Sequence, residues 1–179
     1  NMIQYCKRCC LPSTKPHLSF DEEGICNACR NYENRKNVDW DERKKELMEI
    51  LDRYRSKDGS NWDCIIPVSG GKDSTYQVIT MLELGMNPLC VTATTCDLTD
   101  IGRRNIENIK KMGVDYIEVT TNRVVRAKLN RIGLTEVGDI SWPEHVSIFT
   151  VPVRMAVNFN VPLIIWGENS QNEYGGPAA

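Results

Sequence analysis

The chain has 179 residues, of which 41% are hydrophobic and 26% charged, values of an ordinary globular protein that argue against disorder and fibrous repeats. Its 22 basic and 24 acidic side chains give a net charge of -2, which argues against a protein-wide attraction to nucleic acid. No apolar run reaches the roughly eighteen residues that a membrane span needs, and the N-terminus lacks the pattern of a signal peptide, so we expect a cytoplasmic protein with no membrane partner.

Residues 2–38 form a predicted metal-binding module. They contain two Cys-x-x-Cys pairs separated by sixteen residues: Cys6, Cys9, Cys26 and Cys29. Two such pairs facing each other complete a tetrahedral Zn²⁺ site, and in a stretch this poor in large apolar residues the metal would supply folding free energy. We therefore expect a zinc-ribbon-like module with a structural Zn²⁺. An iron–sulfur cluster and two local disulfides are the alternatives, and Cys10 is an alternative to Cys9 as a ligand.

Residues 39–61 are predicted to form a linker helix. Asp39 with Glu42 three residues later is a capping-box pattern, and the apolar residues that follow recur at helical spacing. Turn-forming residues at 57–61 end the helix, which we expect over residues 40–56.

From residue 62 to residue 179 short apolar runs alternate with longer amphipathic stretches, which is typical of a parallel sheet covered by helices. We expect strands at residues 64–68, 89–95, 116–119 and 163–166, and helices at 74–84, 101–112 and 148–159. Residues 131–147 fit either a loop or an irregular helix. The predicted fold is a doubly wound α/β sheet preceded by the cysteine module.

A candidate phosphate loop directly follows the first predicted strand. It consists of Ser69, Gly70, Gly71, Lys72, Asp73 and Ser74. Two glycines permit a tight turn whose N–H groups point inward, and the start of the next helix adds positive potential. Lys72 supplies a mobile charge, Asp73 offers a carboxylate to Mg²⁺, and the two serines offer hydroxyls to phosphate oxygens. The alternative is a glycine turn that only connects strand to helix.

This Ser-Gly-Gly-Lys-Asp-Ser pattern resembles the pyrophosphate loop, or PP-loop, of the ATP pyrophosphatase superfamily, usually written SGGxDS. The resemblance implies a sheet of the adenine nucleotide alpha hydrolase type that binds ATP and Mg²⁺ at the loop. It also implies that Thr94, at the end of the second predicted strand, contacts the nucleotide, and that Glu168 and Asn169 bind ATP or substrate. Lys72, Asp73 and Glu168 are then the catalytic candidates. A plain hydrophilic loop is the alternative interpretation of residues 167–173.

The cysteine pairs, the loop and the stretch Trp-Gly-Glu-Asn-Ser at 166–170 together resemble the N-acetyl sugar amidotransferases of bacterial surface polysaccharide synthesis, which serve lipopolysaccharide O-antigen or nonulosonic acid pathways. That family converts an acetamido group of a sugar nucleotide into an acetamidino group, using ATP and ammonia. The chain has no recognisable glutaminase nucleophile. The resemblance therefore suggests an ammonia-supplying glutaminase partner similar to the subunits of imidazole glycerol phosphate synthase.

Two other functions remain open. A PP-loop tRNA-thiolating enzyme would need a basic RNA-binding surface, against which the net charge counts. A non-catalytic scaffold would keep the zinc ribbon and a nucleotide-binding loop. The superfamily sheet normally has a fifth strand, whereas this sequence ends soon after the fourth predicted one, so we also expect a C-terminally truncated chain.

Basic residues outnumber acidic ones within 103–131. This excess is typical of a solvated helix surface. The functional interpretation is a binding site for an acidic sugar or for its nucleotide diphosphate.

Overall fold

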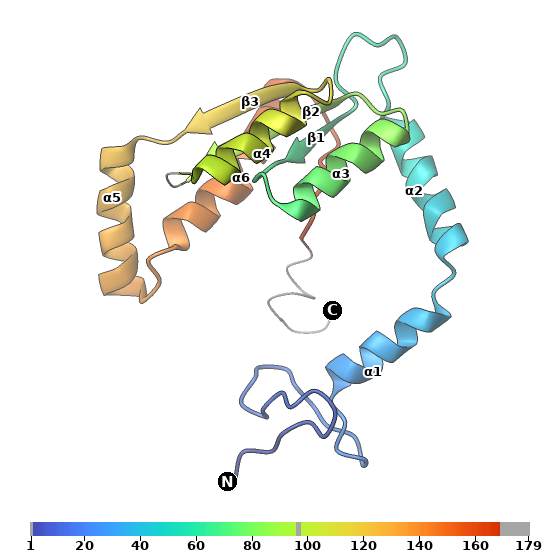
Figure 1. Ribbon diagram of the computed structural model, residues 1–179, viewed down its shortest axis with the longest axis vertical. Coiled ribbons are helices and arrows are strands. Elements are labelled where there is room, and N and C mark those ends of the chain that lie inside the picture. Colours follow the sequence, from blue (N-terminus) through green and yellow to red (C-terminus); the bar gives the residue numbers. More distant parts are fainter. Residues whose placement is uncertain (1, 96–97, 169–179) are drawn as a thin grey trace. The chain divides into compact units, whose positions relative to one another are not determined.

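The computed structural model describes residues 2–95 and 98–168 (Figure 1). The chain divides into two compact units, one containing the cysteine segment as far as Leu47 and the other running from Met48 to Gly167. Within the described residues, no helix combines the length and the apolar character that crossing a bilayer requires.

The cysteine segment has little regular structure before its first helix. Two isolated antiparallel bridges, Tyr5 with Pro12 and Phe20 with Cys26, fold the chain back on itself. Helix α1 (Asn27–Asn34) and the short 3-10 turn η1 (Arg35–Asn37) follow, and neither was predicted from the sequence. Between residues 2 and 47 the buried residues are Cys6, Gly24 and Cys26, so apolar burial contributes little to this unit.

Helix α2 (Trp40–Tyr54) lies where the sequence predicts the linker helix. The Asp39 carboxylate accepts the backbone N–H groups of Asp41 at 3.1 Å and Glu42 at 3.0 Å. These bonds satisfy donors that the first turn of a helix leaves unpaired, as the capping pattern predicts.

Three parallel strands form the sheet of the second unit, in the order β1-β2-β3. They are β1 (Cys64–Pro67), β2 (Pro88–Thr94) and β3 (Asp115–Thr120). The predicted fourth strand is reduced to one parallel bridge, in which Ile65 N donates to Leu163 O at 2.8 Å and Ile165 N donates to Ile65 O at 2.9 Å. The next bond of this ladder would need an N–H at position 67, and a proline has none.

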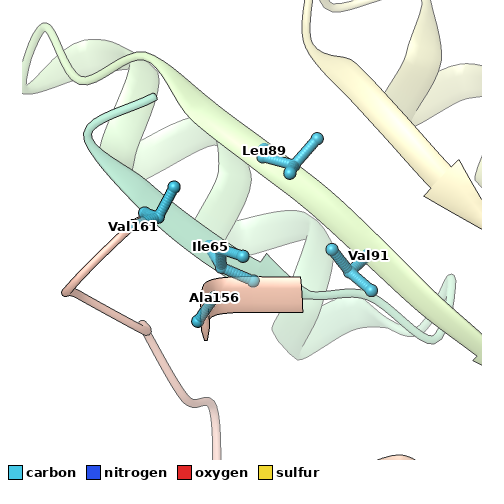
Figure 2. Packing of buried hydrophobic residues seen from close by; sticks show 5 residues of the cluster. All are labelled: Ile65, Leu89, Val91, Ala156 and Val161. Atoms are coloured by element: carbon cyan, nitrogen blue, oxygen red, sulfur yellow. The ribbon is translucent and has the colours of Figure 1, made fainter. Parts of the chain in front are cut away.

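Helices cover both faces of this sheet, as predicted for a doubly wound fold. Helices α3 (Lys72–Glu83) and α4 (Asp100–Lys110) lie on one face and α6 (Trp142–Asn158) lies on the other (Figure 1). Figure 2 shows the core on the α6 side, formed by Ile65, Leu89, Val91, Ala156 and Val161. Because successive side chains of a strand point to opposite faces, Ile66 and Cys90 are buried on the α3 and α4 side.

The segment that the sequence left open is mostly helical. Helix α5 (Arg123–Ile132), which was not predicted, continues into a short π-helical stretch, η2 (Gly133–Val137). Asn122 begins α5, because its side-chain oxygen accepts the N–H groups of Val124 at 3.0 Å and Val125 at 3.1 Å. Helix α6 starts six residues earlier than predicted, with Pro143 in its first turn, where proline is tolerated.

Candidate functional site

The loop between β1 and α3 requires glycine at position 70. Gly70 has a φ of 81°, in the left-handed region that other residues rarely adopt. A Cβ atom there would lie 3.2 Å from Ile106 Cγ1 and 3.3 Å from the carbonyl oxygen of Gly102, so a side chain would press against α4. Asn105 of α4 donates from Nδ2 to the Gly70 carbonyl at 3.0 Å. Helix α4 therefore holds the loop in place, and nothing in the sequence pattern predicted the role of Asn105.

The start of α3 has the character of an anion-binding site. Gly71 is its N-terminal flanking residue, and no side chain in the described ranges caps the helix. Gly71 N donates to the Ser69 hydroxyl at 3.3 Å, so the loop itself supplies an acceptor for one N–H group. Uncapped N–H groups and the helix dipole favour a bound anion at such a position.

Lys72 and Asp73, the first two residues of α3, pair with each other. Lys72 Nζ lies 2.7 Å from one carboxylate oxygen of Asp73 and 2.9 Å from the other, and both side chains are exposed. An accessible carboxylate beside a phosphate site fits Mg²⁺, which usually keeps several waters and takes one or two carboxylates together with substrate phosphates. Glu168 is exposed at the end of the described chain, and Asn169 lies outside the described residues.

The two predicted serines differ in position. Ser69 is exposed on the loop, whereas Ser74 is buried and donates its hydroxyl to the Gly71 carbonyl at 3.2 Å. Thr75, which the motif does not include, donates to the same carbonyl at 2.9 Å. Ser74 and Thr75 therefore fix the backbone of the loop, and Ser69 is the serine that faces solvent.

The loop lies at the point where the strand order reverses. The chain runs outward from β1 to β2 and β3 and then returns to the other edge of β1 at Ile164. In doubly wound sheets ligands bind at this point, beyond the carboxyl ends of the strands. Gly167 follows the returning segment, and a Cβ there would lie 3.0 Å from Gln77 Oε1 of α3, so a larger residue at this position requires the Gln77 side chain to move.

Thr94, the predicted nucleotide contact, ends β2 with both of its polar groups bonded. Its hydroxyl donates to Glu118 Oε1 at 2.8 Å, and its carbonyl accepts from Arg126 Nη1 at 2.9 Å. Arg103 also bonds Glu118, at 2.8 Å, and this guanidinium holds the pKa of the Glu118 carboxyl below its usual range. The position of these charged residues beside Thr94 could not be predicted from the sequence, because they come from β3, α4 and α5, far from Thr94 along the chain.

The four predicted zinc ligands come together. The Sγ atoms of Cys6, Cys9, Cys26 and Cys29 all lie within 4.8 Å of one another. The Cys6–Cys29 separation is 4.0 Å and the Cys9–Cys26 separation is 3.5 Å. Tetrahedral Zn–S bonds of about 2.3 Å place sulfur atoms about 3.8 Å apart, so this donor set fits zinc. Cys10 is exposed and lies outside the group, which favours Cys9 as the ligand.

Backbone groups already favour a thiolate at Cys6. Burial opposes ionisation, but N–H groups of the surrounding chain, those of Arg8 at 3.4 Å and Cys26 at 3.3 Å among them, donate to its sulfur. They lower the pKa of Cys6 to about 6, whereas burial raises the pKa of Cys29 to about 12. A metal ion would supply the charge needed to ionise all four thiols.

Comparison with known proteins shows the fold. No family model matches the chain. An uncharacterized protein of Methanocaldococcus jannaschii is 31% identical over 99 residues, which are 55% of this chain and 35% of that protein. NMN synthetase from Francisella tularensis superposes with a TM-score of 0.53 at 14% identity, covering 73% of this chain and 55% of that one. NH3-dependent NAD synthetase from Campylobacter jejuni subsp. jejuni superposes with a TM-score of 0.55 at 13% identity, covering 75% of this chain and 58% of that one.

The chain thus spans about a third of the curated relative and somewhat more than half of each synthetase. Its described residues combine a parallel sheet covered by helices on both faces with a preceding cluster of four cysteines. The fold of the sheet unit is the α/β fold of these two synthetase structures.

Proposed function

We propose that this chain is an ATP-dependent, AMP-forming amidotransferase that converts the acetamido group of an N-acetyl sugar nucleotide into an acetamidino group. The observation that carries the proposal is the turn at Gly70 and Gly71, which leads from a buried strand into an uncapped helix with Lys72 in its first turn. Backbone N–H groups, a helix N-terminus and a mobile cation converge there, and this combination suits the phosphates of ATP. The sugar substrate rests on the sequence resemblance.

The chemistry requires activation of an amide. The amide oxygen attacks the α-phosphorus of ATP and displaces pyrophosphate, which turns a poor leaving group into AMP. Ammonia then attacks the former carbonyl carbon, AMP departs with the oxygen, and loss of a proton leaves the amidine. Lys72 and the loop N–H groups would stabilise the negative charge that develops on pyrophosphate.

Two carboxylates are the candidates to hold Mg²⁺ in this reaction. Asp73 follows Lys72 in α3, and Glu168 follows the segment that returns to β1. When bound, the ion would neutralise phosphate charge during the transfer.

Ammonia would come from a separate glutaminase partner. The fold shared with an NH3-dependent NAD synthetase supports ammonia as the nucleophile. Of the described cysteines outside the four-sulfur cluster, Cys10 is exposed, whereas Cys64 and Cys90 are buried; burial raises the pKa of each of these two thiols to about 12, so neither of the two suits a glutaminase nucleophile. The protein would then use ammonia without producing it.

The test is an assay for AMP release from ATP with an ammonium salt and an acetamido sugar nucleotide. We expect Lys72→Ala to abolish AMP formation while the melting temperature stays unchanged, because the side chain is exposed. Lys57→Ala, which removes an exposed lysine outside the loop, is the matched control. An unchanged rate in Lys72→Ala would remove the loop from the mechanism. AMP release that depends on tRNA would select the thiolating enzyme, and no AMP under any condition would favour the scaffold.

A further inference from the structure

A cleft of about 270 Å³ opens where β2 and β3 end, one strand away from the phosphate loop. Its polar lining residues are Thr94, Thr120, Arg123, Arg126, Asn130 and Glu144. They come from two strands and two helices of the same compact unit, so the cleft is a feature of the fold rather than of one loop.

The two carboxylate oxygens of Glu144, a residue of the cleft lining, differ in their hydrogen bonding. Its Oε1 accepts from Asn130 Nδ2 at 2.7 Å and lies 3.4 Å from Arg126 Nε. Its Oε2 is shielded from water and has no hydrogen-bond partner in the described part of the chain. An unpartnered carboxylate oxygen in this setting costs free energy. A ligand that offers a hydroxyl or amide N–H, with a small rotation of the carboxylate toward the cleft, would remove that cost.

Cationic side chains border the same cleft. Arg126 is fixed, because its Nη1 donates to the Thr94 carbonyl at 2.9 Å and to the Thr121 hydroxyl at 3.2 Å. Arg123 lines both this cleft and a neighbouring depression along α5, which Lys128 and Arg131 also line. Among the described residues that line the two hollows, Glu144 is the single acidic one, so these side chains favour an anionic group.

We propose that this cleft binds the acceptor substrate as a sugar phosphate, with a hydroxyl or amide N–H of the N-acetyl sugar donating to Glu144 and a phosphate facing Arg123. A phosphorylated sugar offers both a hydrogen-bond donor and an anion, and the cleft presents a partner for each. The inference rests on the proposed function and adds to it the position of the sugar nucleotide, at the ends of β2 and β3.

The experiment measures binding by calorimetry in the absence of ATP, with UDP-N-acetylglucosamine and UMP as probes. Arg123→Ala should weaken both ligands by about tenfold, because each carries phosphate. Glu144→Gln should weaken binding of UDP-N-acetylglucosamine by about tenfold and leave binding of UMP unchanged. Glutamine keeps the shape of the side chain but has an NH2 donor in place of one carboxylate oxygen. Arg104→Ala, which removes an exposed arginine of α4 outside the cleft, should bind both ligands as wild type does.

The outcomes separate this inference from the proposed function. If the wild-type protein forms AMP with the sugar nucleotide, and both Arg123→Ala and Glu144→Gln bind that nucleotide as wild type does, the proposed binding role of the cleft is wrong and the proposed function stands. Equal losses for UMP and the sugar nucleotide in Glu144→Gln show a structural effect and also overturn it. If no acetamido sugar supports AMP formation, the proposed function fails, and the binding measurements alone then test the cleft. A wild-type protein that binds neither UDP-N-acetylglucosamine nor UMP overturns the proposal for the cleft as well.

Discussion

The two units of this chain use different physical means to fold. From residue 2 to residue 47 the buried side chains are essentially two cysteines, and four sulfur atoms converge where another domain would have an apolar core. The sheet unit buries aliphatic side chains on both faces of three strands. We therefore expect the first unit to depend on a bound metal for its stability, whereas the second depends on apolar packing.

Loss of a zinc ligand should separate the two units most clearly. We expect Cys26→Ser to release the metal and unfold the cysteine segment, since structural zinc sites supply about 10–16 kcal/mol of apparent binding free energy. The sheet unit should remain folded. Metal analysis and hydrogen exchange measure the two effects. Cys10→Ser is the matched control, because Cys10 is exposed and lies outside the sulfur cluster; zinc loss from that variant, or zinc-free wild type, would contradict the assignment.

Truncation of the sheet core should have the converse effect. Leu89 is 1% exposed and packs in the cluster on the α6 side. Leu89→Ala should lower the free energy of unfolding of the sheet unit by about 2–5 kcal/mol, the range for cavities left by large apolar residues. Urea denaturation measures this loss, and the zinc content should stay at the wild-type value. A simultaneous loss of zinc would mean that the units are not independent.

A substitution at Gly70 should damage the site more than the fold. Gly70→Ala forces a Cβ into the left-handed region and against α4, at a cost of about 1–3 kcal/mol. AMP formation should be lost, because the loop N–H groups would be displaced. Gly59→Ala is the control: Gly59 also has a positive φ, but no atom lies within 4 Å of its added Cβ. Full activity in Gly70→Ala would show that the turn tolerates displacement.

The smallest effect is expected at Glu118, with a definite dependence on pH. Arg103 holds the pKa of Glu118 below its usual value. The ion pair between them therefore stabilises the folded state at neutral pH, and this contribution is lost as the pH falls through the lowered pKa. Glu118→Gln should therefore lower the melting temperature by about 2–4 °C at pH 7 and by progressively less below about pH 4. A difference that is constant between pH 7 and pH 3 would show that the charge is not responsible.

Local sequence patterns predicted those helices, strands and metal ligands whose structure is determined by residues close together in the sequence. Asp39 capped its helix, the cysteine spacing brought four sulfurs together, and alternating apolar runs predicted the three strands. The failures came from contacts distant in sequence. Pro67 has no N–H for the next bond of the ladder with residues 163–166, although each segment alone favours a strand.

The residues around the candidate site were harder to predict. Asn105, which holds the loop, and Glu144, which lines the cleft, are single polar residues within helices. Only the packing of those helices against the sheet gives such residues a partner, so no local pattern could distinguish them from ordinary surface positions.

The ion pair between Lys72 and Asp73 has a consequence for ligand selectivity. A bare anion that draws Lys72 away leaves the exposed Asp73 carboxylate to water, and a bare cation that takes Asp73 leaves the Lys72 ammonium to water, so either alone gives up an exposed ion pair worth about 1 kcal/mol or less. A metal-chelated nucleotide satisfies both groups in the same encounter. The pair would thus give a chelated nucleotide a small advantage over chloride, free phosphate or unchelated ATP, without any steric barrier.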